Sequence, residues 1–180
     1  MSGASANANF HTATAQDVFA ARKEDPRFQE YRLRWVNDPA RFRAGNFPIH
    51  LDIESTGVCN LRCPFCATTM KIWGPDVPGY MKRELFEKII DEGAREGLCS
   101  IKLSFRGEPT LHPHLPDMVA YAKQQGILDV YFNTNATMLT DGLVHRLIDA
   151  GLDRISVSFE GTHKEVYEIQ RVGAKFEKVV

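Results

Sequence analysis

Residues 100–134, SIKLSFRGEPTLHPHLPDMVAYAKQQGILDVYFNT, carry the strand–helix–strand pattern that decides the fold. Residues 100–105 and 129–133 are predicted to be strands, and residues 115–125 between them are predicted to be a helix that ends at Gly126. Two strands that are joined by a helix pair in parallel, because the crossover returns the chain to the same end of the sheet. This stretch therefore predicts one unit of a parallel α/β sheet.

The same pattern repeats on both sides of this stretch. Strands are predicted at 48–54 and 154–159, and helices at 81–97, 140–150 and from 163 to about 171. Four strand–helix repeats predict an α/β fold, a partial (β/α) barrel of parallel strands with outer helices. In such sheets the functional site lies at the carboxyl ends of the strands.

The N-terminal region differs from the rest of the chain. Residues 1–46 are predicted to be a disordered tail and a helical extension, and residues 47–180 are predicted to be the main domain. Residues 1–14 are small and polar without periodicity. Residues 16–43 have apolar side chains spaced among charges, with helix starts expected at Asp25-Pro26 and at Asp38-Pro39. The basic residues of this region are interpreted as the solvated face of amphipathic helices, with a docking surface for a partner as the alternative.

Charge and hydropathy exclude several classes of partner. The 180 residues include 22 basic and 23 acidic side chains, for a formal net charge of −1. No field of one sign is present to attract nucleic acid or an anionic membrane, so neither partner is expected. No apolar stretch reaches the ~18–20 residues of a membrane span, and the first residues do not resemble a secretory signal. A cytoplasmic protein is expected.

Three of the four cysteines are crowded into Cys59-Asn-Leu-Arg-Cys63-Pro-Phe-Cys66. Crowded cysteines indicate metal or redox chemistry rather than a disulfide framework. Three thiolates from one loop can hold three irons of a cubane cluster and leave the fourth iron open to a ligand. The alternative is a zinc site that adds His112 or His114 to the cysteines.

This cysteine spacing after a first strand resembles the radical S-adenosylmethionine (radical SAM) superfamily, and the resemblance covers residues 49–180. It implies an enzyme in which Cys59, Cys63 and Cys66 hold a [4Fe–4S] cluster and the open iron chelates the amino and carboxylate groups of S-adenosylmethionine. An electron then breaks the sulfonium–C5′ bond, and the 5′-deoxyadenosyl radical abstracts hydrogen from a substrate. The cofactors carry this chemistry, so no catalytic side chain is predicted.

The resemblance also implies what surrounds these cofactors. The substrate is expected to be a peptide, a sugar or a small metabolite, and the electron is expected to come from a reductant such as flavodoxin or ferredoxin. The family's barrel has six βα units, of which about four are expected here. Residues 176–180 read as the middle of a helix, which suggests that the last strands are missing.

Phe65 and a turn after the second predicted strand extend the resemblance. Gly107-Glu108-Pro109 is similar to the family's Gly-Gly-Glu-Pro element, which receives the ammonium group of S-adenosylmethionine. Arg106 stands where the family has its first glycine. Phe65 is expected to pack near the adenine. A common turn is the structural alternative for Gly107 and Glu108.

The third and fourth predicted strands are also followed by family-like residues. Asn135 belongs to a run that is similar to the family's Thr-Asn-Gly/Ala element, with an Asx-type turn as the alternative. Ser158 is implied to bond the ribose or carboxylate, and Arg171 to pair with the methionine carboxylate. Glu160 stands where the family often has Asp. Cys99 is interpreted as a small buried apolar residue and not as a ligand.

The sequence around the cysteine and Gly-Glu-Pro motifs most resembles that of family members that carry a C-terminal auxiliary-cluster (SPASM-type) extension. Two further hypotheses stay open beside a radical SAM enzyme. One is a zinc-stabilised binding module whose strands present an interaction surface. The other is a fragment that binds a cluster but does not catalyse.

Overall fold

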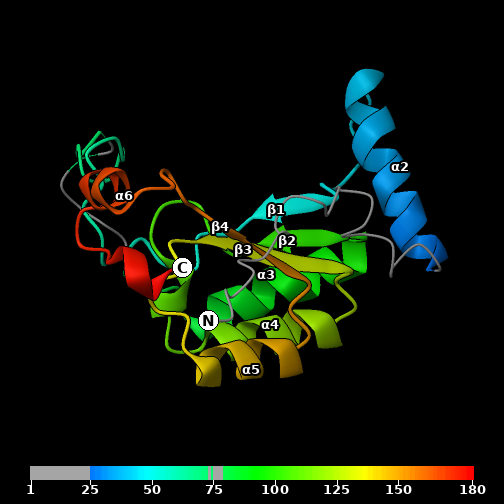
Figure 1. Cartoon of the computed structure of the whole chain (residues 1–180). Coiled ribbons are helices and arrows are strands. Elements are labelled where there is room, and N and C mark those ends of the chain that lie inside the picture. Colours follow the sequence, from blue (N-terminus) through cyan, green and yellow to red (C-terminus); the bar gives the residue numbers. More distant parts are fainter. Residues whose placement is uncertain (1–24, 73, 75–78) are drawn as a thin grey trace, which may run out of the picture. The chain divides into compact units, whose positions relative to one another are not determined.

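The computed structural model describes residues 25–72, 74 and 79–180 (Figure 1). The chain divides into two compact units between Ala44 and Gly45. The predicted disordered segment 1–14 lies outside the described residues, as does the first part of the predicted helical region 16–43.

The described part of the first unit contains helix α2 (Pro26–Ala40). Asp25 caps its N-terminus by accepting a hydrogen bond from the backbone N–H of Arg27 at 2.9 Å. The expectation that a helix starts at Asp38 is wrong, because α2 continues through Pro39. A proline in the last turn removes only one intrahelical hydrogen bond, so the helix tolerates it there.

The second unit is built on a four-stranded sheet in the order β1-β2-β3-β4. All three strand pairings are parallel, which confirms the predicted α/β class. The strands are β1 (His50–Asp52), β2 (Ser100–Lys102), β3 (Asp129–Thr134) and β4 (Arg154–Val157). β1, β2 and β4 are each shorter than predicted. Between the first two strands, the chain leaves the ladder after Ile53. There the hydroxyl of Ser55, rather than a backbone group, donates to the carbonyl of Leu103 at 2.8 Å.

Helices cover one face of this sheet. Figure 1 shows α3 (Arg83–Glu96), α4 (Leu115–Gln124) and α5 (Asp141–Asp149) side by side beneath the strands. Thr140 caps α5, with its side chain accepting from the N–H of Leu143. The core between the helices and the sheet contains Ile53, Phe86, Ile90, Leu98, Ile101, Leu103, Leu115, Met118, Val119, Ala122, Ile127, Val130, Phe132, Leu143 and Leu147. Burial of these side chains fixes the helix-covered face.

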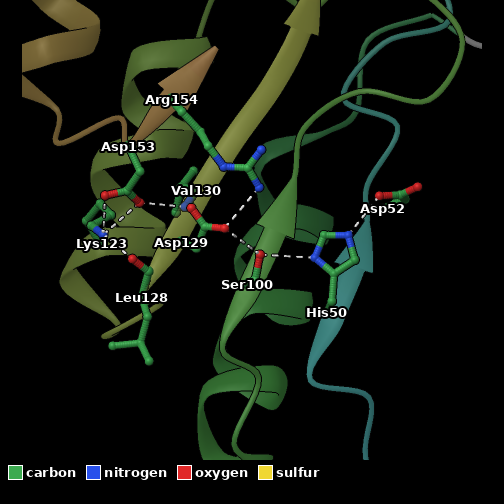
Figure 2. Close-up of polar contacts among 9 residues, drawn as sticks. All are labelled: His50, Asp52, Ser100, Lys123, Leu128, Asp129, Val130, Asp153 and Arg154. Carbon is green, nitrogen blue, oxygen red and sulfur yellow. Dashed lines mark hydrogen bonds and ion pairs between the residues drawn. The ribbon is translucent and has the colours of Figure 1, made fainter. Parts of the chain in front are cut away.

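Alternation along the strands places polar side chains on the opposite face of the sheet. Figure 2 shows a chain of contacts across the amino ends of all four strands. The ring of His50 lies 3.0 Å from Asp52 and 3.0 Å from the hydroxyl of Ser100. Asp129, which is fully buried, accepts from Ser100 at 3.5 Å and from Arg154 at 3.1 Å. These contacts tie the strands together at the end of the sheet remote from the loops that follow them.

The chain ends in two short elements beyond β4, helix α6 (Lys164–Gln170) and the 3₁₀ helix η4 (Phe176–Lys178). A further 3₁₀ helix, η3 (Pro109–Leu111), follows β2. The expectation that the last residues lie inside an α-helix is wrong, since η4 is a single tight turn. The N–H groups of both Val179 and Val180 donate to the carbonyl of Phe176, which closes that turn.

Candidate functional site

The loops at the carboxyl ends of the strands enclose a cavity of about 620 Å³. All nine site residues predicted from the sequence line it. They are Cys59, Cys63, Cys66, Phe65, Gly107, Glu108, Asn135, Ser158 and Arg171. The loops after all four strands therefore contribute to one cavity, as parallel strands that share an edge predict.

Donors surround the sulfurs of the first two cysteines in the loop after β1. The sulfur of Cys59 accepts from the N–H of Leu61 at 3.4 Å and from the side-chain amide of Asn135 at 3.9 Å. The sulfur of Cys63, which is buried, accepts from the guanidinium of Arg171 at 3.7 Å. Each of these two sulfurs therefore has at least one N–H donor within 4 Å.

The third cysteine titrates differently from the first. Burial raises the pKa of the Cys59 thiol, although the N–H of Leu61 opposes this. Burial also acts to raise the pKa of Cys66, but hydrogen bonds from the backbone and hydroxyl groups of Thr69 and Thr68 lower it below the usual value. Cys66 is therefore the thiol in this pair that deprotonates more readily.

Glu108 is a buried carboxylate with four hydrogen-bond donors. Its Oε1 accepts from the N–H of Thr110 at 3.2 Å, from the hydroxyl of Thr110 at 2.6 Å and from the hydroxyl of Thr134 at 2.6 Å. Its Oε2 accepts from the N–H of Asn135 at 2.7 Å. The side chain joins the loop after β2 to the loop after β3, a positioning role that the sequence does not reveal.

Gly107 permits a close approach between two backbone segments. A Cβ at this position would lie 2.1 Å from the carbonyl oxygen of Thr56 and 2.7 Å from that of Val58. The next N–H, that of Glu108, donates to the Val58 carbonyl at 2.7 Å. The glycine therefore seats the loop after β2 against the segment that leads into the cysteine loop.

Asn135 is held by its neighbours in a fixed orientation. Its amide oxygen accepts from the N–H and hydroxyl of Thr137 at 3.0 and 2.7 Å, and its amide nitrogen donates to Asn60 at 3.0 Å. Ala136 has a φ of 62°, the left-handed conformation that non-glycine residues rarely adopt. This turn contains an Asx-type contact and also directs the amide nitrogen toward Cys59.

Arg171 lies at the end of α6 beside the cysteine loop. It forms an ion pair with Glu160, and its guanidinium carbon lies 5.6 Å from the ring centroid of Phe65, which is half-exposed. Burial acts to lower the pKa of Arg171, but the hydrogen bonds to Glu160 raise it overall. Ser158 lines the same cavity, and its N–H donates to Thr134 at 2.9 Å.

Sequence reasoning missed several residues that line the cavity. Lys102 and Ser104 line it at the end of β2. Their period-two spacing, which puts both side chains on one face of the strand, could have indicated this from the sequence. Arg106, in place of a family glycine, donates through Nε and Nη2 to the two carboxylate oxygens of Glu54, each at 2.6 Å. This bidentate pair raises the pKa of Arg106 and joins the loops after β1 and β2.

The histidines of the zinc alternative have other partners. The ring of His112 bonds the carbonyl of Met81 at 3.1 Å and accepts from the N–H of His114 at 3.2 Å. His114 in turn lies 3.2 Å from Asp117. Within residues 25–72, 74 and 79–180, no three His, Cys, Asp or Glu side chains are arranged to hold one metal ion. Cys99 is only partly buried, and its thiol donates to the Gly97 carbonyl at 3.3 Å.

Comparison with known proteins matches most of the chain to one family. The family model described as "Radical SAM superfamily" matches residues 53–180. The chain is 37% identical over 112 residues to the tungsten-containing aldehyde ferredoxin oxidoreductase cofactor-modifying protein of Pyrococcus furiosus, a match that covers 62% of this chain and 30% of that protein. It is 30% identical over 128 residues to the PqqA peptide cyclase of Granulibacter bethesdensis, covering 70% and 32%. It is 32% identical over 127 residues to the probable GTP 3′,8-cyclase of Methanococcus maripaludis, covering 71% and 41%.

A solved structure shares the fold. Native anSMEcpe with bound AdoMet and Kp18Cys peptide matches with a TM-score of 0.58 and 22% identity, over 72% of this chain and 38% of that one. The chain spans between 30% and 41% of the length of the curated relatives described above. None of the helices in the described residues is long and apolar enough to cross a membrane.

Proposed function

Because this chain belongs to the radical SAM superfamily, whose cofactors are a [4Fe–4S] cluster and S-adenosylmethionine, we propose that it is the cofactor-binding part of a radical SAM enzyme. One observation carries the proposal. The three cysteines and all six predicted cofactor-binding residues line a single cavity at the carboxyl edge of the sheet. When bound, the cluster supplies the electron that cleaves the sulfonium–C5′ bond, and the radical so formed abstracts hydrogen from the substrate.

The donors around the cysteines fit a cluster with three thiolate ligands. A cubane takes each thiolate at a different iron, whereas zinc needs all its ligands to converge on one ion. Anionic sulfur is stabilised by N–H and O–H donors, and Cys59, Cys63 and Cys66 each have at least one. These three cysteines would hold the cluster.

The remaining residues are proposed to orient S-adenosylmethionine. Glu108 Oε2 accepts one hydrogen bond, whereas Oε1 accepts three, so Oε2 keeps acceptor capacity for the methionine ammonium. Arg171 has five N–H donors, and its pairing with Glu160 leaves some for the methionine carboxylate. Ser158 would bond the ribose or carboxylate, and Phe65 would pack against the adenine.

The proposed enzyme also needs a substrate and a source of electrons. The relatives are named for a peptide, a nucleotide and the modification of a protein cofactor, so their names do not point to one common substrate. We assign a peptide or small-molecule substrate and a one-electron reductant such as flavodoxin or ferredoxin.

The test is anaerobic reconstitution of the chain with iron and sulfide, followed by counting of iron, sulfide and zinc. S-adenosylmethionine and a chemical reductant are then added, and 5′-deoxyadenosine is measured. About four irons with formation of 5′-deoxyadenosine is the expected result. Stoichiometric zinc would favour the binding module, and a cluster without cofactor cleavage would favour the non-catalytic fragment.

Two alanine variants sharpen this test. Cys63→Ala should abolish cluster binding, because it removes a buried ligand from the loop. Cys99→Ala is the matched control, since it removes a cysteine that lies outside the cysteine loop and does not line the cavity, and whose thiol donates to the Gly97 carbonyl. Equal iron content in the two variants would refute the assignment of the cysteine loop.

A further inference from the structure

The side chain of Tyr167 is fully buried, yet within the part of the chain that the structure describes its hydroxyl has no hydrogen-bond partner. A hydroxyl in this condition loses its bonds to water and gains none in return. Buried tyrosine hydroxyls in folded proteins usually find a partner. The unpaired hydroxyl therefore needs an explanation.

Tyr167 packs against the cysteine loop. It shares one buried cluster with Leu61, Cys63 and Ala174, and partly buried Cys59, Cys66, Phe176 and Val179 pack around that cluster. Its ring centroid lies 4.9 Å from that of Phe159 and 5.7 Å from that of Phe176. Aromatic, aliphatic and cysteine side chains surround the ring, so phenylalanine would satisfy the packing at this position equally well.

The polar groups near Tyr167 are few. The charged side chains near Tyr167 are those of Arg171, Glu160 and Glu168. Arg171 and Glu160 already form an ion pair with each other. Glu168 accepts from the N–H of Phe176 and pairs with Lys175. Cys63 shares the buried cluster with Tyr167, and among the described residues the side-chain donor to its sulfur is Arg171, at 3.7 Å. Sulfur is a weak acceptor in a thiol and a strong one in a thiolate. Cys63 is therefore the partner that gains acceptor strength when a cluster binds.

We propose that the Tyr167 hydroxyl donates a hydrogen bond to the sulfur of Cys63 once that sulfur is a cluster ligand. This inference rests on the proposed function. A hydrogen bond to a ligand sulfur stabilises the reduced, more negative cluster, so it raises the reduction potential. Tyr167 is then a tuning residue for the cluster and does not touch the substrate.

The test is a redox titration of the reconstituted chain monitored by EPR, with Tyr167→Phe compared with wild type. The substitution removes one oxygen and keeps the ring. We expect the ratio of reduced to oxidised cluster at a fixed potential to fall about tenfold, which is ~59 mV for one electron. Tyr121→Phe is the matched control, because Tyr121 donates to Asp91 on the outer helices at 2.6 Å. Its potential should equal that of wild type.

Two further readouts separate tuning from a structural role. Without the cluster, Tyr167→Phe should unfold at the same Tm as wild type or a higher one, since it removes an unpaired group, whereas Tyr121→Phe should unfold at a lower Tm. In deuterated buffer, ENDOR of the reduced cluster should show one exchangeable deuteron fewer in Tyr167→Phe than in wild type. The N–H donors of Leu61, Asn135 and Arg171 exchange in both proteins.

The possible failures are distinguishable. If wild type binds no cluster, the proposed function fails. If wild type binds a cluster and Tyr167→Phe has the wild-type reduction potential and the wild-type set of exchangeable deuterons, the role of Tyr167 is refuted while the proposed function stands.

Discussion

The side-chain amide nitrogen of Asn135 lies 3.9 Å from the sulfur of Cys59, although 76 positions separate the two residues in the chain. Asn135 follows β3 and Cys59 follows β1, so the parallel sheet brings their loops together. The same amide is fixed by Asn60 and Thr137. The sheet thus adds a fixed N–H donor to the sulfur of Cys59, which receives one hydrogen bond from its own loop, from the N–H of Leu61.

Asn135→Ala should weaken retention of the cluster. Loss of an oriented donor next to a metal ligand typically costs 10–100-fold in metal affinity. We expect the reconstituted variant to lose iron to a chelator at least about tenfold faster than wild type. Asn133→Ala, which changes another asparagine that lines the cavity, should lose iron at the wild-type rate. Equal rates in all three proteins would show that the amide does not support Cys59.

Two glycine-to-alanine substitutions should have opposite effects on stability. In Gly107→Ala the new Cβ meets backbone oxygens that cannot move aside, so the free energy of unfolding should fall by about 1–3 kcal/mol. In Gly142→Ala, in the first turn of α5, the new Cβ meets nothing within 4 Å. That substitution should raise the free energy of unfolding by about 0.5 kcal/mol through helix propensity. Chemical denaturation measures both, and a stable Gly107→Ala would contradict the close approach to Thr56.

Glu108→Gln should destabilise the chain even without cofactors. The amide places an N–H group where a carboxylate oxygen now accepts from backbone or hydroxyl donors. A buried donor left facing a donor costs about 1–3 kcal/mol. Glu87→Gln, in the surface pair with Arg83, is the control and should cost less than about 1 kcal/mol. Similar losses in both variants would mean that Glu108 does not join the two loops.

His112 should make stability depend on pH. Burial lowers the pKa of His112, and the neighbouring His114 lowers it further, although the bond to Met81 opposes the shift. Below the unfolded pKa of about 6.5 the unfolded chain binds a proton that the folded chain does not, so the free energy of unfolding falls as the pH falls. Denaturation between pH 7.5 and 5 should show this slope in wild type and a weaker one in His112→Gln. His145→Gln, an exposed control on α5, should retain the wild-type slope; a slope unchanged in His112→Gln would exclude this residue as the source.

The fold was predictable because local signals agree with the tertiary structure. The alternation in β3 and the capping of α5 by Thr140 reflect the same buried face that forms the core. The length of β1 was not predictable, since a strand needs a ladder partner and the chain turns away after Ile53. The helix start predicted at Asp38-Pro39 was wrong because a proline, which is common in the first turn of a helix, lies here in the last turn of α2.

The candidate site was predictable as a set of strand-end loops and less so in its contacts. Strand ends of a parallel sheet meet at one edge, so Cys59 and Ser158 line the same cavity. Partners far apart in sequence leave no local signal. Arg106 pairs with Glu54 across 52 positions, and Tyr167 packs on Cys63 because α6 folds back onto the cysteine loop. Such pairings are decided by tertiary packing alone.

The central claim is that one cavity holds both a cluster and S-adenosylmethionine. The most direct test is the EPR spectrum of the reconstituted, reduced chain, recorded with and without S-adenosylmethionine under anaerobic conditions. A signal from a reduced [4Fe–4S] cluster that changes when S-adenosylmethionine is added, and that Cys63→Ala lacks, is the predicted result. A cluster signal that S-adenosylmethionine leaves unchanged at saturating concentration would contradict the account.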